Sequence, residues 1–376
     1  MAEAYVRSAA LAPFGNTPDR DLEALVHPPV VQAVREAGLT PDDVDAVICG
    51  TYVNGPLAAQ RALSGLGLSD RPTINTENAC ASSSFAAAIA VTLVRQELYR
   101  NVLVIGLEQL SKLDSSLLPL AEDDPEVRAG LVMPAVYAMR AQRHMAVYGT
   151  TDEQLAKVSV KSHANGALNP YARYRKPVAL DEVLESRMIS TPLTLLQCSS
   201  GGDGAGAAVI GDQPGEAGPV RFVASATSAG RETSEPRELA QSELGRKVAD
   251  EAYEQAALGP DDLDVVECHD AFTIGEILAY EALGLCEPGG GGELIDGGDT
   301  EIGGRIPVNT GGGLLSRGHP VGATGVAQLA EITWQLQDRA DARQVEGARV
   351  GMTHTTGGGI AGYDHAACAV HVLVAE

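Results

Sequence analysis

Aromatic residues are scarce in this sequence, and its cysteines follow no metal-binding or disulfide pattern. Only 4% of the 376 residues are aromatic, with one tryptophan, whereas 42 are glycine. A core of small and aliphatic side chains suits close packing of helices against sheets. The six cysteines are scattered, without a CxxC pair or the spacing of a secreted disulfide scaffold. The sequence therefore predicts reduced thiols and no bound metal.

An export signal and a long apolar run are also missing. The opening stretch MAEAYVRSAALAPFG lacks a basic start followed by an apolar segment. No apolar run reaches the roughly 20 residues that cross a bilayer. The net charge of −23 disfavours nucleic acid and anionic membranes as partners. A cytoplasmic protein with neither a membrane nor a nucleic-acid partner is the simplest expectation.

Positive charge is nevertheless concentrated at residues 139–176. This basic island holds seven Lys or Arg residues and only two acidic residues. Such an island can attract an anionic ligand, although a solvated surface explains it equally well. Its cations are Arg140, Arg143, Lys157, Lys161, Arg173, Arg175 and Lys176.

The chain repeats one structural unit. EAGLTPDDVDAVICG at 36–50 matches QAALGPDDLDVVECH at 255–269, each with a helix end, a Pro-Asp-Asp turn and a short apolar strand. Further along each half, a helix with apolar residues at helical spacing leads into another apolar strand. Strands that alternate with helices, twice over, predict a duplicated α/β fold. We place its halves at residues 1–217 and 218–376.

The two halves differ by an insert at about residues 112–195, which contains the basic island. The insert reads mainly as helix, and one helix is predicted to begin at Thr150 or Thr151, with Glu153 in its first turn. Excursions from a rigid core often carry binding residues. A glycine-rich stretch at 288–304 is predicted to be a flexible surface loop.

One thiol, Cys80, stands at the start of a predicted helix in NTENACASSSFAAAIA (75–90). Such a cysteine can be a core residue, a metal ligand, half of a disulfide or a nucleophile. At a helix N-terminus, unpaired backbone N–H groups and the helix dipole stabilise a thiolate. Its small neighbours let another element approach closely.

Other segments are expected to meet Cys80, because a duplicated fold brings equivalent loops together around its pseudo-twofold axis. They are CHDAFT (268–273), GHPVGATG (318–325) and HTTGGG (354–359). His319 lies between glycines that permit close contact with a ligand. His269 ends a strand, and side-chain alternation turns Cys268 to the other face, toward the core.

At these residues the sequence resembles the thiolase superfamily, most closely the sterol-carrier-protein-type branch with its acetyl-CoA acetyltransferase-like members. The resemblance covers nearly the whole chain. It rests on the Cys80 segment, YGTTDEQLA (148–156), LNP (168–170), SRMISTPLTLLQCSSGGDGAGAAVI (186–210), HDAF, NTGGGLLSRGHPVGATG and TTGGG. It implies a layered α-β-α-β-α fold with two pseudo-symmetric halves and an inserted loop domain.

The resemblance also implies roles for individual residues. Cys80 matches the acyl-accepting nucleophile, His319 the histidine that activates it, and His269 a position that helps to form an oxyanion hole. These roles suit a thiolate that attacks a thioester. The pocket-lining turn and its flank match His354, Thr355, Gly357, Gly358 and Gly359. The region that meets coenzyme A phosphates matches the basic insert, with candidates Arg140, Arg143, Arg173, Arg175 and Lys176.

The sequence departs from the family pattern at the second catalytic cysteine. Typical members carry it in a CxGGG motif, where this chain has Thr355, and the sterol-carrier branch can carry it in HDCF, where this chain has Ala271. A threonine hydroxyl cannot act as a base near neutral pH. Three replacements are conceivable: His269, His354 and Cys268. We favour His269, which would give a Cys-His-His arrangement like that of decarboxylating ketoacyl synthases.

The leading interpretation is an acyl-CoA C-acyltransferase that cleaves a 3-oxoacyl-CoA with CoA, or runs the reverse Claisen condensation, through acyl-Cys80. One alternative is a retro-aldol lyase acting on a hydroxyacyl-CoA of the steroid side-chain type. Such relatives are expected to use tyrosines, and Tyr363 follows the glycine turn. Another alternative is a non-catalytic, thiolase-like partner subunit. The retained Cys80 and His319 favour the acyltransferase.

The expected ligands are acyl-CoA and CoA, both as substrates, with no resident cofactor. By resemblance, the chain forms a homodimer or a dimer of dimers. Relatives without the second cysteine often pair with a small OB-fold protein that carries a zinc ribbon. Such a partner subunit is therefore a further expectation for this chain.

Overall fold

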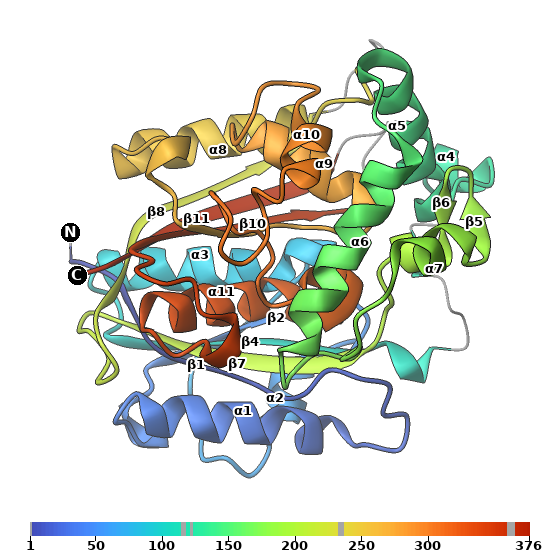
Figure 1. Ribbon diagram of the computed structural model, residues 1–376. Coiled ribbons are helices and arrows are strands. Elements are labelled where there is room, and N and C mark those ends of the chain that lie inside the picture. The colour runs from blue at the N-terminus through green and yellow to red at the C-terminus, as the bar shows by residue number, and fades with distance from the viewer. Residues whose placement is uncertain (1, 114–117, 121–122, 232–236, 359–364) are drawn as a thin grey trace.

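The structure is a computed structural model that describes residues 2–113, 118–120, 123–231, 237–358 and 365–376 (Figure 1). Its strands are β1 (Tyr5–Leu11), β2 (Ala46–Gly50), β3 (Thr73–Thr76), β4 (Asn101–Gln109), β5 (Met188–Ser190), β6 (Leu193–Thr194), β7 (Asp203–Gly211), β8 (Val220–Ala229), β9 (Val265–Glu267), β10 (Val350–Gly357) and β11 (Ala367–Ala375). Its helices are α1 (Leu22–Glu36), α2 (Ala58–Ala62), α3 (Ser82–Arg95), α4 (Pro125–Arg128), α5 (Met133–Tyr148), α6 (Asp152–Ala167), α7 (Leu180–Glu185), α8 (Glu243–Ala256), α9 (Thr273–Ala282), α10 (Gly291–Asp296) and α11 (Thr324–Leu336).

One mixed sheet carries the repeat. Its strand order is β3-β2-β4-β7-β1-β8-β11-β10-β9. The pairings are mirrored about the junction of β1 and β8: β1–β7 and β8–β11 are antiparallel, β7–β4 and β11–β10 are antiparallel, and β4–β2 and β10–β9 are parallel. This symmetry is the structural counterpart of the repeated sequence. The boundary between residues 217 and 218 stays a prediction.

The sheet folds around two central helices, so that five layers are stacked (Figure 1). Helices α3 and α11 lie between the strands of the first half and those of the second, α8 covers one outer face, and α1 covers the other. The predicted α-β-α-β-α layering is therefore confirmed. The two β layers are continuous, because Tyr5 of β1 pairs with Arg221 of β8.

Small side chains allow the central layer to pack closely. Every residue of α11 is buried. A Cβ atom on Gly325 would lie 2.5 Å from the backbone nitrogen of Ser84, so only glycine permits this contact between α11 and α3. The glycine-rich composition predicted such packing. The close contact holds the starts of α3 and α11 side by side, which positions the residues just before each helix.

The insert folds as predicted, mainly into helices. Thr151 caps α6 by accepting the backbone N–H of Gln154, and the Gln154 side chain completes this capping box in place of Glu153. The longest helices of the insert, α5 and α6, have 16 residues each. Within the described residues, no helix is both long and apolar enough to cross a membrane.

The glycine-rich stretch at 288–304 is partly helical, so the predicted flexible loop is wrong there. Helix α10 lies within it, and Gly291 and Gly292 are buried. A Cβ on Gly292 would lie 2.5 Å from the amide oxygen of Gln154. The glycines allow α10 to pack closely against α6. A glycine-rich sequence can indicate either such close packing or a flexible loop, and the sequence alone does not decide between them.

Candidate active site

A cavity of about 1090 Å³ brings the predicted catalytic residues together. Cys80, His269 and His319 all line it. One nitrogen or sulfur atom from each of the three lies within 4.8 Å of the other two. Thiol sulfur and imidazole nitrogen are also the ligands that zinc prefers. The absence of a metal stays a prediction from the sequence.

Cys80 is presented by a tight turn. A short 3-10 turn, Ala79–Ala81, precedes α3, and Ala79 has a φ of 47°, a left-handed conformation that is unfavourable for alanine. The hydroxyl of Ser82 accepts the backbone N–H of Asn78 at 2.9 Å and donates to the Ala79 carbonyl at 2.6 Å. A Cβ on Gly357 would lie 2.1 Å from the Asn78 carbonyl oxygen. The end of β10 therefore presses directly against the turn and fixes it.

His319 is oriented as a base toward Cys80. Its Nε2 lies 3.1 Å from the Cys80 Sγ, and its Nδ1 lies 2.8 Å from the Thr324 hydroxyl. That hydroxyl donates to the Pro320 carbonyl at 3.4 Å, so it accepts a hydrogen bond from Nδ1–H. With the proton on Nδ1, the Nε2 lone pair faces the thiol and can remove its proton.

The pKa shifts of Cys80 and His319 both favour the uncharged forms. Burial lowers the pKa of His319 to about 3, and Arg317 contributes to the shift. Burial also raises the pKa of Cys80 to about 12; Glu108 adds to the rise, and the backbone N–H groups of Cys80 and Gly358 oppose it. The backbone donors at the helix start lower the pKa of Cys80, as sequence reasoning expected, but burial has the larger effect.

His269 offers its second ring nitrogen to the cavity. The Thr356 hydroxyl lies 3.1 Å from Nδ1, whereas Nε2 is buried and has no hydrogen-bond partner among the described residues. Its ring stands edge-on to that of His319, with centroids 5.4 Å apart. Burial, with smaller contributions from neighbouring histidines, holds the pKa of His269 well below its ordinary value. A neutral imidazole in this position can donate a hydrogen bond to a substrate oxygen.

Strand alternation decides which part of the HTTGGG segment faces the cavity. Thr355 accepts a hydrogen bond from the Ser84 hydroxyl at 2.9 Å and donates to Gln328, so it faces α3 and α11. Thr356 and Gly358 line the cavity. His354 instead borders a separate inner cavity. Gly359 and Tyr363 lie outside the described residues.

The placement of Thr355 and His354 corrects the expectation that both line the pocket. Consecutive residues of β10 point to opposite faces, and the face that Thr355 occupies is filled by the central helices. His354 shares the face of Thr356 but lines only the smaller cavity. Gly357 has no side chain to direct into the cavity, and its contribution is the close approach of β10 to Cys80. Thr356, which sequence reasoning missed, is the hydroxyl that meets His269.

The basic island does not form one anion-binding surface. Among its five candidate coenzyme A residues, Arg173 lines the cavity. Arg140 is buried and donates to the carbonyls of Leu239 and Gln241, and Arg143 forms an ion pair of 2.7 Å with Glu238. Arg175 and Lys176 are exposed and do not line the cavity. The basic residues are close together in the sequence, but they do not gather at one place in the structure.

Glu108 is a functional neighbour that sequence reasoning missed. Its carboxylate accepts the backbone N–H groups of Tyr52 at 2.9 Å, Val53 at 3.0 Å and Gly322 at 2.9 Å. Burial raises its pKa to about 7, against the effect of these donors. The available signal was an acidic residue within the otherwise apolar stretch NVLVIGLEQ of β4.

Further titratable groups line the same cavity without a sequence signal. Tyr137 comes from α5, His365 precedes β11, and Cys198 precedes β7. The Tyr137 hydroxyl lies 2.8 Å from Nε2 of His365. Cys198 donates to the Thr194 carbonyl at 3.3 Å, and burial raises its pKa to about 12.

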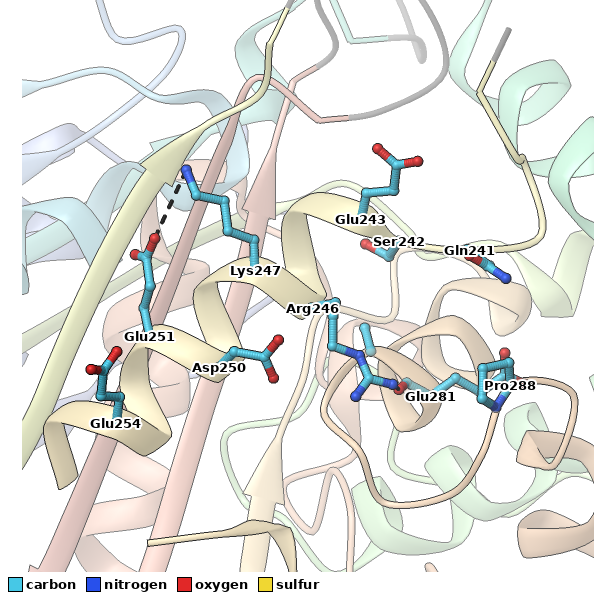
Figure 2. A pocket seen from close by; sticks show the side chains of 11 residues that line it. Gln241, Ser242, Glu243, Arg246, Lys247, Asp250, Glu251, Glu254, Glu281 and Pro288 are labelled. Atoms are coloured by element: carbon cyan, nitrogen blue, oxygen red, sulfur yellow. Dashed lines mark hydrogen bonds and ion pairs between the residues drawn. The ribbon is translucent and has the colours of Figure 1, made fainter. Parts of the chain in front are cut away.

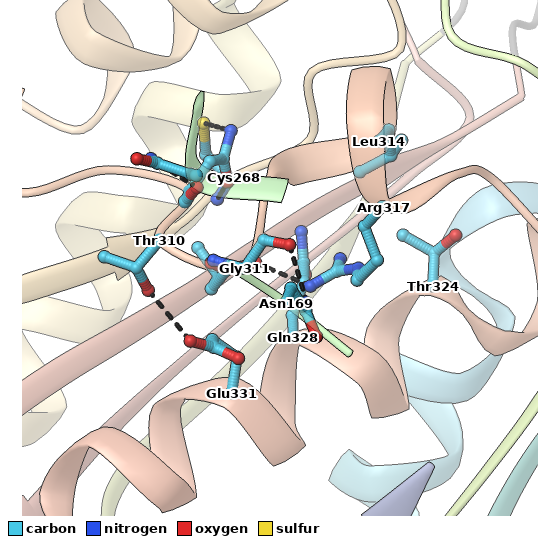
Figure 3. Close-up of polar contacts among 12 residues, drawn as sticks. Asn169, Cys268, Thr310, Gly311, Leu314, Arg317, Thr324, Gln328 and Glu331 are labelled. Carbon is cyan, nitrogen blue, oxygen red and sulfur yellow. Dashed lines mark hydrogen bonds and ion pairs between the residues drawn. The ribbon is translucent and has the colours of Figure 1, made fainter. Parts of the chain in front are cut away.

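Buried polar contacts support the loop that delivers His319 (Figure 3). Arg317 donates to Glu267 at 2.8 Å, which joins this loop to the end of β9. In the same network Thr310 donates to Glu331 of α11 at 3.2 Å, and the Asn169 amide donates to the Gly311 carbonyl at 2.8 Å. Because these partners are buried, losing one would leave an unpaired polar group, and the loop is held rigidly.

A second hollow of about 600 Å³ lies along α8 (Figure 2). Charged side chains of both signs line it, among them Arg246, Asp250 and Glu254. Lys247 and Glu251 form an ion pair of 3.8 Å on its rim. Cys80, His269 and His319 do not line this hollow, so the predicted chemistry belongs to the larger cavity.

The fold and the site together are those of an enzyme with a duplicated α/β framework, in whose cavity a cysteine lies next to a histidine. The chain belongs to the thiolase family. A family model described as "Thiolase, N-terminal domain" matches residues 4–191, and one described as "Thiolase C-terminal domain-like" matches residues 225–369.

Similar proteins support this assignment. The chain is 38% identical to an acetyl-CoA acetyltransferase of Methanothermobacter thermautotrophicus, over 95% of this chain and 97% of that one. It is 36% identical to the benzoylsuccinyl-CoA thiolase subunit BbsB of Thauera aromatica, over 94% of each chain. Rat sterol carrier protein 2 is 36% identical over 82% of this chain and 61% of its own length. The predicted class, a thiolase-like acyl-CoA acyltransferase, is thereby confirmed.

A solved structure, described as "Ltp2-ChsH2(DUF35) aldolase", shares the fold. Its TM-score is 0.86, with 24% identity over 99% of this chain and 98% of that one. At this level of identity, the similarity shows the architecture and leaves the reaction to be argued from the site.

Proposed function

We propose that this protein transfers acyl groups between CoA thioesters and carbon, acting on 3-oxoacyl-CoA through an acyl-Cys80 intermediate. The observation that carries the proposal is the 3.1 Å contact between the Cys80 Sγ and the His319 Nε2, in a cavity that both residues line. A cysteine with an adjacent, correctly oriented base is the arrangement that nucleophilic catalysis requires.

In the cleavage direction, His319 takes the thiol proton as Sγ attacks the 3-oxo carbon. The C2–C3 bond then breaks, which leaves an acyl group on Cys80 and an enolate on the departing thioester. CoA releases the acyl group by attacking its carbonyl carbon. Claisen condensation is the same sequence in reverse. In both directions, negative charge develops on the oxygen of the attacked carbonyl and on the oxygen of the enolate, and both charges have to be stabilised.

Two sets of donors suit those oxygens. The backbone N–H groups of Cys80 and Gly358 are directed at the nucleophile, and they favour the anionic form of its sulfur. The Nε2 of His269, unpartnered within the described residues, is available to a thioester oxygen when the proton is on that nitrogen. Donors fixed before the reaction stabilise developing charge without reorganisation. We assign His269 to the enolate of the carbon–carbon step.

Arg173 is the cation that we assign to CoA. It lines the cavity and donates to the Gly201 carbonyl. The preceding residue, Ser200, accepts the backbone N–H of His319 through its carbonyl at 3.0 Å. A guanidinium at the cavity wall can bind a phosphate while the thioester reaches inward. Arg175 and Lys176 follow on an exposed segment and would add a weaker, screened attraction.

Intact mass after incubation with acetyl-CoA tests the proposal. We expect an increase equal to one acetyl group, absent from the Cys80→Ala variant. Retro-aldol cleavage of a hydroxyacyl-CoA that persists in Cys80→Ala would instead support the lyase. The phenol of Tyr137 in the cavity is the feature that favours this second candidate. Neither reaction in the purified chain, with activity restored by a second subunit, would support the non-catalytic partner.

The proposed assembly is a homodimer or dimer of dimers, with an OB-fold, zinc-ribbon subunit as a further partner. The aldolase of similar fold carries a name with two components, and the relative from Thauera aromatica is named as a subunit. Light scattering of the chain alone and with a co-expressed partner would measure both states. A cytoplasmic location and the absence of a resident cofactor remain part of the proposal.

A further inference from the structure

The carbon–carbon step needs a second proton transfer, at C2 of the thioester that forms the enolate. At that stage the acyl group is bonded to the Cys80 sulfur, toward which the Nε2 of His319 is directed. His269 is assigned above to the enolate oxygen as a donor, and burial also holds the pKa of its ring well below the ordinary value. Thr355 faces the core, and Ala271 carries no titratable group. The cavity wall carries further titratable groups that can move the proton.

Tyr137 and His365 form a coupled pair in the wall of this cavity. The Tyr137 hydroxyl lies 2.8 Å from Nε2 of His365. The ring of His365 stands edge-on to that of His269, with centroids 6.5 Å apart. Tyr137 also stacks on Phe272, at 4.5 Å between centroids. The segment that carries His269 therefore positions the phenol as well.

The pair also separates the active cavity from a smaller one. Four residues line both spaces: Tyr137, His269, Thr356 and His365. The inner space measures about 10 Å³, the size for a single water molecule. His354 also lines this space; it is buried and has no hydrogen-bond partner on either ring nitrogen in the described part of the chain. A water molecule there would connect the pair to a further imidazole.

We propose that Tyr137 is the group that exchanges the C2 proton with substrate, and that His365 is the positioning residue that takes up the phenolic proton. The proposal rests on the function proposed above. In the condensation direction, the C2–H bond breaks and its proton moves to the phenol oxygen, while the phenol proton passes to Nε2 of His365. The enolate attacks acyl-Cys80, the carbon–sulfur bond breaks, and the pair returns a proton to the Cys80 thiolate. Cleavage is the reverse, so the protons balance in both directions.

Deuterium exchange into acetyl-CoA isolates this step. The purified full chain is incubated with acetyl-CoA in D₂O, and deuterium at C2 is followed by mass spectrometry alongside acetylation of Cys80. General acid–base groups contribute about 10²–10⁴-fold. We therefore expect Tyr137→Phe and His365→Gln to lower exchange and condensation at least about 100-fold. Both variants should acetylate Cys80 as the unmodified chain does.

Tyr148→Phe is the matched control, because Tyr148 is on the same helix but contacts His144 and Gln241 instead of the cavity. It should keep the full exchange rate. Cys198→Ala tests the rival thiol in the cavity wall. Unchanged exchange in Tyr137→Phe, or loss of exchange in Cys198→Ala alone, would overturn the proposal. Absence of the acetyl adduct from the unmodified chain would instead refute the proposed function.

Discussion

The carboxylate of Glu108 accepts the backbone N–H of Gly322 at 2.9 Å and thereby joins the end of β4 to the loop that carries His319. Gly322 stands three residues after His319, and the other backbone donors to Glu108 come from Tyr52 and Val53. One buried acid thus fixes the distance between three chain segments around Cys80. Its negative charge also helps to keep the Cys80 thiol protonated.

Replacing Glu108 with glutamine should destabilise the protein and misplace His319. Both carboxylate oxygens accept N–H groups, so the amide nitrogen of the introduced glutamine would face a donor and leave it unpaired. A buried donor without a partner costs about 1–3 kcal/mol of unfolding free energy. Urea unfolding measures this loss. Glu346→Gln, at an exposed position, should change the free energy by less than about 0.5 kcal/mol.

Cys80 should react slowly with iodoacetamide at neutral pH. Its pKa is raised to about 12, so its thiolate fraction at pH 8 lies below that of a free cysteine with a pKa near 8.5. The alkylation rate should still be rising at about pH 10. Intact mass follows the reaction, and Cys80→Ala corrects for the other thiols. A plateau in the rate below neutral pH would show a stabilised resting thiolate.

Replacing His269 with alanine should separate the two half-reactions. The variant should still form acyl-Cys80, because the Cys80–His319 contact remains. Condensation should fall by about 10²–10³-fold, the usual effect of removing one oxyanion donor. His269→Asn, which keeps an N–H donor, should recover part of the rate. Condensation at the unmodified rate in His269→Ala would remove His269 from the mechanism.

Replacing Arg173 with alanine should affect CoA binding more than chemistry. We expect the KM for CoA to rise about 10-fold or more, as a charge-assisted hydrogen bond of about 1.5–3 kcal/mol would predict, with a smaller change in kcat. An N-acetylcysteamine thioester lacks the phosphates, so its turnover should not change. Arg140→Ala is the contrasting variant, because Arg140 is buried and should affect folding instead. An equal KM effect on both thioesters would argue against a phosphate contact.

His371 should make folding sensitive to acid. Its Nε2 donates to the Ser84 carbonyl at 3.1 Å, and burial lowers its pKa from 6.5 to about 4. As the pH falls from 6.5 to 4, the unfolded chain gains a proton that the folded protein still excludes. Above the pKa of the unfolded chain, the neutral ring stabilises the folded protein, and this stability is lost as the pH falls from 6.5 to 4. At about 1.4 kcal/mol per pH unit, the loss in unfolding free energy reaches up to about 3 kcal/mol.

Guanidinium unfolding of the unmodified chain and of His371→Gln at neutral and at acidic pH measures the effect. The advantage of the unmodified chain should shrink as the pH falls, because glutamine does not titrate. Taking the difference between the two proteins cancels the contributions of the other buried acids and histidines. A constant difference would mean that His371 titrates alike in both states.

Much of the fold was predictable because its signals are local and occur twice. The Pro-Asp-Asp turns and the apolar strands after them identify the repeat, and the symmetry of the repeat predicts that Cys80, His269 and His319 meet. Glu108 and the Tyr137–His365 pair could not be predicted in this way. The last two residues are 228 positions apart, and their contact depends on packing between the insert and the second half.

The basic island shows a different kind of error. Its charges were counted along the chain, but residues four apart on a helix share a face. Arg140 and His144 of α5 are both buried, and so is Lys161 of α6, which pairs with Glu276. The helical period would have predicted that these side chains are buried. Arg173 would then have remained among the candidate anion-binding residues.

The alternation along β10 has a consequence for how this enzyme can change over evolution. Thr355 belongs to the packed interior between β10 and the central helices, whereas Thr356, one position further along, lines the cavity. Substitutions at Thr356 can alter the chemistry offered to a bound thioester without opening the central layer. Two adjacent positions of one strand thus carry separate constraints, one from the packed central layer and the other from the cavity.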